Sequence, residues 1–386
     1  MKKIIVIAVL VLIDILNGLS VTPPETLESL FLDIRENVRG VNKEYKDVIS
    51  NYFQRLETLN QELEVKGKSS DELLNILIEK DLIKDAISSE TLKYNFKLVK
   101  IRYKKGLDLI KLLYEKILDL DHHFTALNTY QNISNISNPN SYPEFLKSKE
   151  QLTKNLTNKS TIKIPDILKS NIYVSLATTV VSAFIGSGKK AQRTEDMKKI
   201  SCILDFTALM HSDLNIIYYE TEFLKDNNIT MKTNIIKLFG EYTKPIKYRV
   251  GLSECRNTDD WDSVDEHLEE FLVRLEKLSK NATGSPEYRK AIKAISNIEF
   301  SLDRVLNFLN KYSSFVDQGS KYYNKFYKII NNYKNLDKCS SKLPIQYDEL
   351  KQDIKLSIQK FKTAYDIGEL KGTGLRDLVY GNPEAY

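Results

Sequence analysis

Apolar residues recur at alternating intervals of four and three along the early part of the chain. The repeat runs from Leu27 to Leu63, with one extra interval of four between Tyr52 and Leu56. Its members are Leu27, Phe31, Ile34, Val38, Val41, Tyr45, Val48, Tyr52, Leu56, Leu59 and Leu63. Such a heptad seam predicts one helix, about 55–60 Å long, that packs along a partner helix.

A second heptad repeat follows the break at KGKSSDE, where Ser70 is expected to cap a new helix. Its apolar members are Leu92, Phe96, Val99, Tyr103, Ile110, Leu113, Ile117 and Leu120. Gly106 occupies one seam position, and because glycine has no side chain, we expect another element to approach closely there. The two repeats predict an N-terminal pair of long helices over residues 21–127.

The pattern breaks at residues 128–165, which are rich in Asn, Ser and Pro and are predicted to form a loop region. A clear helix is then predicted from Thr194 to Asn227–Asn228, a pair expected to end it. Its apolar face comprises Ile203, Phe206, Met210, Leu214, Ile217 and Leu224. Further helices are predicted over 263–280, 286–335 and 345–366, and an irregular tail over 367–386.

Helix breakers are few, with 14 Gly and 9 Pro in 386 residues, and the sequence shows no convincing strand pairs. Scarce breakers in a long chain favour long helices. We therefore predict an all-α fold, an elongated bundle of long antiparallel coiled-coil-like helices. Its C-terminal helical bundle is expected over residues 166–366 and contains an apolar segment, 172–185.

The apolar segment 172–185 carries no charged residue. As a helix it would present rows of small residues spaced by four, which let another backbone approach closely. The residues that mark it as a membrane or close-packing segment are Ser175, Thr178, Thr179, Val180, Ser182, Ala183, Phe184 and Gly186. Its fourteen residues are fewer than the roughly twenty of a spanning helix. We interpret it as a buried packing helix, with membrane insertion and partner binding as alternatives.

The segment ends in GSGKKA, which fits a loose dinucleotide-binding fingerprint, G-x-G-x-x-A. That fingerprint needs parallel strands beside it, whereas the flanking sequence has helical periodicity. A Walker A loop is excluded, because its first glycine would fall at Ala183 and its Ser or Thr at Lys190. No cofactor is expected.

Residues 1–20 have the parts of a secretory signal: a basic start, an apolar core and small residues before a cleavage point after Ser20. Asp14 within the apolar core disfavours the alternative, a retained membrane anchor. We expect the mature chain to be exported, and to reside in the periplasm or outside the cell.

Three cysteines, Cys202, Cys255 and Cys339, suit an exported protein with one disulfide and one thiol left over. Cys202 and Cys255 flank a well-marked helix-and-loop unit, so we predict that they form the disulfide. The other two pairings stay open, because nothing in the sequence excludes them.

Patterns typical of enzymes and metal sites are sparse. Acids and histidines gather in DLDHHF and CRNTDDWDSVDEH, but adjacent helical residues point in different directions, and acids also suit the first turn of a helix. We expect no metal site and no enzymatic activity. The net charge of +5 is too small to indicate a nucleic-acid partner.

In outline, the predicted protein resembles the secreted α-helical pore-forming toxins, which are long helical bundles with one apolar element that inserts into membranes. The resemblance is architectural and transfers no site residue. We predict an exported, non-enzymatic component of a cell-envelope apparatus for secretion, conjugation or adhesion, which binds protein partners or itself through helical faces. The alternative is a pore-forming or membrane-perturbing protein that inserts segment 172–185, with a membrane surface as its partner.

Overall fold

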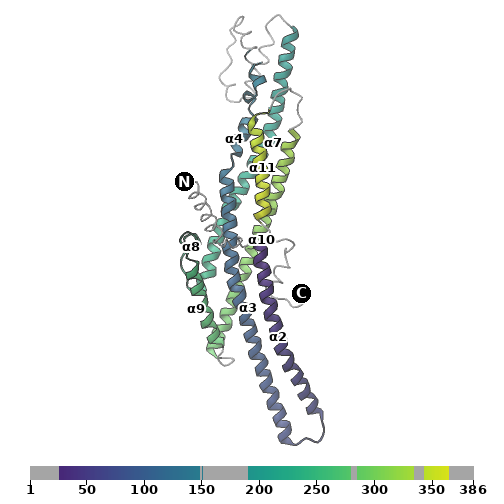
Figure 1. Cartoon of the computed structure of the whole chain (residues 1–386), viewed down its shortest axis with the longest axis vertical. Helices are drawn as coiled ribbons and strands as arrows, with labels where there is room; N and C mark the ends of the chain where they lie inside the picture. The colour runs from purple at the N-terminus through teal and green to yellow at the C-terminus, as the bar shows by residue number, and fades with distance from the viewer. Residues whose placement is uncertain (1–25, 148–149, 151–189, 280–284, 334–342, 365–386) are drawn as a thin grey trace, which may run out of the picture. The chain divides into compact units, whose positions relative to one another are not determined.

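The computed structural model describes residues 26–147, 150, 190–279, 285–333 and 343–364, and no strand occurs among them (Figure 1). The chain is therefore all-α, as predicted. Its long helices are α2 (Leu27–Glu64), α3 (Ser70–Ala126), α7 (Lys190–Thr243) and α10 (Pro286–Tyr333). The shorter elements are α4 (Thr129–Ile136), η1 (Pro139–Ser141), η3 (Lys244–Ile246), α8 (Leu252–Thr258), α9 (Trp261–Ser279) and α11 (Ile345–Ala364).

Three sequence predictions lie outside the described residues. These are the secretory signal over residues 1–20, the apolar segment 172–185 together with Gly186, and the irregular tail over 367–386.

The chain divides into two compact units, each assembled from segments that are distant in the sequence. Unit 1 comprises Met1–Glu115, Thr233–Lys311 and Asp366–Tyr386. Unit 2 comprises Lys116–Lys232 and Tyr312–Tyr365. Helices α3, α7 and α10 each contribute one part to each unit.

In unit 1, α2 and α3 form an antiparallel hairpin (Figure 1). As the residue number rises along α2, the number of the contacted residue on α3 falls, as expected for antiparallel helices. These contacts are Asp33–Lys105 at 2.6 Å, Asn42–Tyr94 at 2.8 Å and Arg55–Glu79 at 2.7 Å. Every residue of the seam predicted for α2 is buried or half-buried, so the inward orientation of that face is confirmed.

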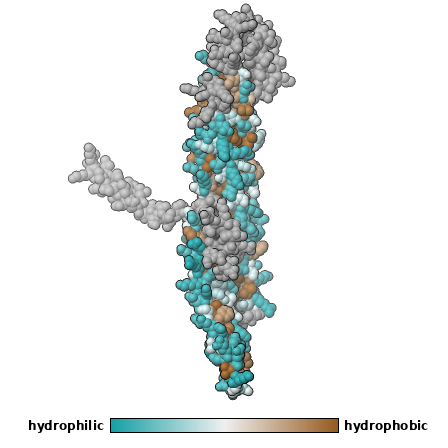
Figure 2. Space-filling view, turned by 90° about the vertical axis from the view of Figure 1, so that its right-hand side faces the viewer, coloured by the Kyte–Doolittle hydropathy of each residue, from teal (hydrophilic) through white to brown (hydrophobic). Residues whose placement is uncertain are grey.

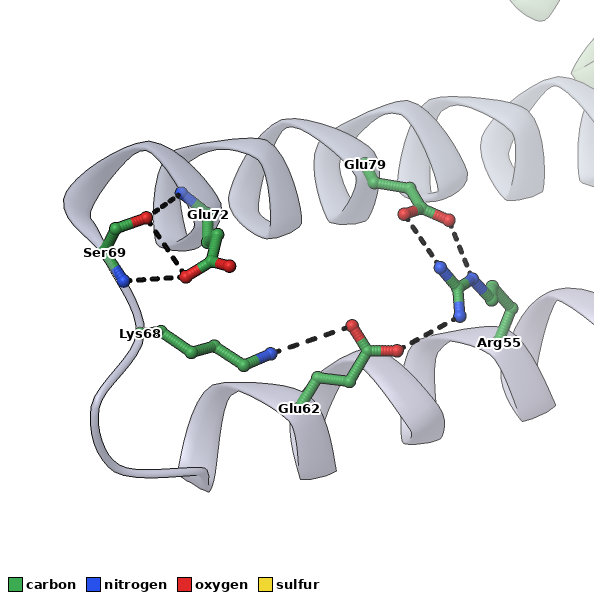
Figure 3. A network of polar contacts seen from close by, with 6 residues as sticks. All are labelled: Arg55, Glu62, Lys68, Ser69, Glu72 and Glu79. Atoms are coloured by element: carbon green, nitrogen blue, oxygen red, sulfur yellow. Dashed lines mark hydrogen bonds and ion pairs between the residues drawn. The ribbon is translucent and has the colours of Figure 1, made fainter.

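The turn of the hairpin is capped by Ser69, one residue before the predicted cap (Figure 3). The Ser69 amide donates to the Glu72 carboxylate at 2.7 Å, and the Glu72 amide donates to Ser69 Oγ at 3.3 Å. This capping box satisfies amide groups that the first helical turn leaves unpaired, and it lowers the pKa of Glu72. Ion pairs continue along the turn: Lys68–Glu62 at 3.9 Å, Arg55–Glu62 at 3.3 Å and Arg55–Glu79 at 2.7 Å.

The close approach predicted at Gly106 is confirmed, and the approaching residue is Tyr242 of α7. A Cβ at Gly106 would lie 2.1 Å from the Tyr242 hydroxyl oxygen. The ring of Tyr242 stacks on that of Tyr103, with centroids 4.6 Å apart. The Tyr103 hydroxyl donates to the Tyr242 carbonyl oxygen at 2.5 Å, and the Tyr242 hydroxyl donates to the Tyr103 carbonyl oxygen at 3.1 Å. Glycine therefore opens the space that this reciprocal contact needs.

Unit 2 contains a second glycine under an aromatic ring. A Cβ at Gly319 of α10 would lie 2.2 Å from a ring carbon of Phe361 of α11. Phe361 also packs against Phe124, Phe315 and Tyr323, with centroid separations of 6.0, 5.9 and 5.6 Å. This ring cluster joins α3, α10 and α11 in the core of unit 2.

Two predicted boundaries are wrong. Asn227–Asn228 does not end its helix, because the Asn228 side chain is fully buried and donates to the Ile117 carbonyl at 3.2 Å, and α7 continues to Thr243. Residues 129–136 were predicted within a loop but form α4, because Ile133 and Ile136 are buried.

The predicted disulfide between Cys202 and Cys255 is also wrong. Cys202 is disulfide-bonded, whereas Cys255 is a buried free thiol. Because α7 is unbroken from Cys202 to Thr243, those residues lie about 60 Å apart. The extended chain from Thr243 to Cys255 spans at most about 40 Å, so the two cysteines cannot approach within the roughly 7 Å that a disulfide requires. Cys339, the third cysteine in the sequence, lies outside the described residues.

Candidate interaction surfaces

The part of α7 that belongs to unit 2 has one face buried in the core. Its residues Ile203, Met210, Leu214, Ile217 and Leu224 are at most 1% exposed. These are residues of the apolar face predicted from the sequence, and Phe206, the other member, is half-buried. This face fixes α7 firmly in unit 2.

The opposite side of α7 carries a second row of apolar residues, which is exposed. Leu209 is 61% exposed, Ile216 41%, Tyr219 68% and Phe223 48%. Their intervals of seven, three and four residues place them on one side of the helix. We call these four residues the α7 seam. Burying apolar surface is favourable, and Tyr and Phe supply much of the binding energy of protein interfaces, so the α7 seam has the composition of a contact surface.

A hollow lies beside the α7 seam, where α4 meets α7. It has a volume of about 170 Å³ and is lined by Tyr130, Ile133, Ser134, Ser137, Asn138, His211 and Asn215. Tyr130, which is 64% exposed, is in ring contact with Tyr218 at 5.3 Å, and Tyr218 with Tyr219 at 5.3 Å. Aromatic rings therefore connect the rim of the hollow to the α7 seam.

The wall of the hollow is a chain of hydrogen bonds. Asn215 Nδ2 lies 3.0 Å from His211 Nε2, and His211 Nδ1 lies 3.1 Å from Ser137 Oγ. Ser137 Oγ donates in turn to the Ile133 carbonyl at 2.7 Å. Because Ser137 Oγ contacts both the Ile133 carbonyl of α4 and His211 of α7, the arrangement serves to fix α4 on α7.

Unit 1 carries a second exposed apolar row, on α3 near the turn of the hairpin. Leu74 is 56% exposed, Leu77 49%, Ile78 49% and Leu82 64%. We call these residues the hairpin face. The cluster behind them is small: its buried residues are Leu59, Ile76 and Ile83. Apolar side chains are visible near this end of the hairpin at the lower end of Figure 2.

A shallow groove of about 230 Å³ also runs between α2 and α3. Tyr45 and Tyr94 stack on its floor with centroids 4.2 Å apart, and the Tyr94 hydroxyl donates to Asn42 Oδ1 at 2.8 Å. On its rim, Lys97 pairs with Glu44 and Lys93 pairs with Glu90, each at 2.6 Å. The rim charges neutralise one another within the hairpin, so they give the groove no preference for a charged ligand.

Four of the acids and histidines singled out in the sequence have side-chain partners in the structure. Asp119 pairs with Lys360 at 2.7 Å, and Asp121 pairs with Lys232 at 2.8 Å. His123 hydrogen-bonds to Ser357 at 2.8 Å, and Asp260 accepts from the Tyr248 hydroxyl at 2.8 Å. Within the described ranges, no group of three or more His, Cys, Asp or Glu side chains could hold a metal ion.

One described stretch, Ile200–Ile246, is long and apolar enough to cross a membrane by length and composition. A third of its most apolar window is buried inside the protein. A core helix of a folded bundle meets the same criteria, and α7 has such a buried face.

Comparison with known proteins finds no relationship: no protein-family model, curated protein or solved structure matches this chain. The function must therefore be inferred from the exposed surfaces themselves.

Proposed function

We propose that the protein is an exported, non-enzymatic interaction protein that assembles with partners in a cell-envelope apparatus. The observation that supports this proposal is the α7 seam. The helix α7 is anchored by one apolar face and exposes a second apolar face. Single exposed apolar residues are common on protein surfaces, whereas an aligned row of them indicates a contact surface. The proposal of export rests on the secretory-signal pattern in the sequence of residues 1–20.

The α7 seam is the main contact in this proposal, and the hairpin face is a second contact. Each unit carries one of them, so a single chain would bind two partner surfaces. Holding two partners on one chain raises their effective concentration for each other without any new contact between them. This is the role of an adaptor in a larger assembly.

The test is to capture partners from the native envelope with the full chain and identify them after chemical cross-linking. The double variant Ile216→Asp, Phe223→Asp places two charges in the α7 seam and should lose one set of cross-linked partners. Val273→Asp is the matched control, because Val273 is 64% exposed but lies on α9 in unit 1. Identical capture by the seam variant and the wild-type chain would refute the proposal.

A membrane-perturbing protein is the second candidate, favoured by the composition of Ile200–Ile246 and by the predicted apolar segment 172–185. A dye-release assay on liposomes separates the two candidates. Leakage that Val180→Asp abolishes would favour membrane insertion. An absence of leakage across pH values and lipid types would remove this candidate and leave the adaptor proposal.

A further inference from the structure

The α7 seam is bracketed by two acidic residues. Asp205 lies four residues before Leu209, and Asp226 lies three residues after Phe223, so both continue the spacing of the seam. Both residues are exposed, and neither carboxylate has an ion-pair partner among the described residues. Along an α-helix they are about 30 Å apart. The surface is therefore an apolar strip with a negative charge at each end.

Other charges on this part of α7 do not neutralise the two ends. Glu220 pairs with Lys325 at 3.1 Å, and Glu222 pairs with Lys225 at 3.9 Å. Asp213 accepts a hydrogen bond from the Tyr333 hydroxyl. Lys325 and Lys225 are therefore engaged by acids other than Asp205 and Asp226.

We infer that the partner of the α7 seam is an amphipathic helix whose apolar stripe is bracketed by Lys or Arg residues about three heptads apart. This inference rests on the proposed function. An apolar row on one helix is buried most simply by the apolar row of a second helix laid along it. Basic residues at the two ends of that row would meet Asp205 and Asp226, and such complementary charges fix register and orientation.

A second copy of the chain fits this surface poorly. An antiparallel pairing centred on Ile216 would place Leu209 against Phe223, but it would also bring Asp205 close to Asp226 of the other copy at both ends. A parallel pairing in register would place each aspartate against its own counterpart. Both symmetric arrangements juxtapose like charges, which disfavours self-association.

The experiment uses three synthetic helical peptides with the same Leu/Ile heptad stripe. Two flanking positions, three heptads apart, are Lys in the first peptide, Gln in the second and Glu in the third. Binding of each peptide to the full chain is measured by fluorescence anisotropy at low ionic strength, where exposed charges are least screened. We expect the Lys peptide to bind about five- to tenfold more tightly than the Glu peptide, because two exposed pairs change from attraction to repulsion.

Two variants assign the binding to this surface. Asp205→Asn with Asp226→Asn should remove the preference for Lys and leave the affinity for the Gln peptide unchanged. Ile216→Asp with Phe223→Asp should abolish binding of all three peptides, and Val273→Asp should change none of them.

Equal binding of the Lys and Glu peptides would overturn the inference about charge. Sedimentation that shows a dimer of the full chain, lost in Ile216→Asp, would overturn it in favour of a second copy. If no peptide binds, yet partners from the envelope are still lost in the seam variant, the helical partner is wrong and the proposed function stands. If the seam variant captures the same partners as the wild-type chain, the proposed function itself fails.

Discussion

The hairpin face and the α7 seam are both exposed rows of four apolar residues, but they differ in what lies behind them. Behind the hairpin face is a small cluster of Leu59, Ile76 and Ile83 between two helices. Behind the α7 seam is a row of core residues at most 1% exposed, which join the wider core of unit 2. An exposed row on a firmly held helix is pre-organised for binding, because less conformational freedom is lost when a partner docks. The packing of the helix behind an exposed apolar row, and not the area of the row alone, therefore indicates a rigid contact surface.

The largest effect should follow from filling the space at Gly319 in unit 2. In Gly319→Ala, the new Cβ would overlap the Phe361 ring at 2.2 Å, and overpacking of this kind should lower the free energy of unfolding by about 3 kcal/mol. Chemical denaturation measures the loss, and hydrogen exchange locates it in α10 and α11. The control is Gly40→Ala on α2, where no atom lies within 4 Å, and which should stabilise the protein by about 0.5–1 kcal/mol. Equal stability of Gly319→Ala and wild type would contradict the tight support assigned to unit 2.

The next effect concerns the weaker support of the hairpin. Leu59→Ala removes a fully buried side chain from a cluster with few members, and should cost about 2–3 kcal/mol. Because that cluster is local, hydrogen exchange should accelerate within residues 52–87 while α7 in unit 2 keeps its protection. Accelerated exchange across both units would show that the hairpin does not open separately.

A smaller effect is expected from mild acidification, through His123 in unit 2. Burial first, and then the charge of nearby Lys360, hold the pKa of His123 below its ordinary value of 6.5. The unfolded chain therefore binds the proton more readily, so the free energy of unfolding falls as the pH drops below about 6.5. His123→Gln should flatten this dependence below about pH 6.5. An unchanged profile in His123→Gln would contradict the assignment.

The smallest effect on folding should come from the α7 seam itself. Phe223→Ala should change the free energy of unfolding by less than about 0.5 kcal/mol, because the side chain is 48% exposed. Leu224→Ala, at the next position, removes a fully buried side chain and should cost about 2–3 kcal/mol. Denaturation of the two variants side by side tests the orientation of α7. A comparable loss in both would mean that the seam is part of the folding core.

Several features of the fold were predictable because they depend on local spacing. The heptad repeat identified the inward face of α2, and Gly106 stood out as a gap in the second repeat. Features that depend on tertiary contacts were not predictable. Asn228 looked like a helix stop, yet its amide is buried against the Ile117 carbonyl, a partner that only the folded chain supplies. The disulfide was predicted because Cys202 and Cys255 flank a helix-and-loop unit, and it fails because the unbroken α7 keeps the two cysteines apart.

The α7 seam itself was visible in the sequence but was not recognised. Leu209, Ile216, Tyr219 and Phe223 keep heptad spacing, but they share their helix with another apolar row, and periodicity cannot tell which of two rows is buried. The hollow beside α4 had no such signal, because α4 lies in a segment rich in Asn and Ser that resembles a loop.

The most direct test of the central claim is quantitative cross-linking of the full chain in its native envelope, with each exposed face altered in turn. Ile216→Asp with Phe223→Asp should remove one set of cross-linked partners, and Ile78→Asp with Leu82→Asp should remove a different set. Val273→Asp should remove none. Retention of every partner in both double variants would contradict the assignment of these two faces as contact surfaces.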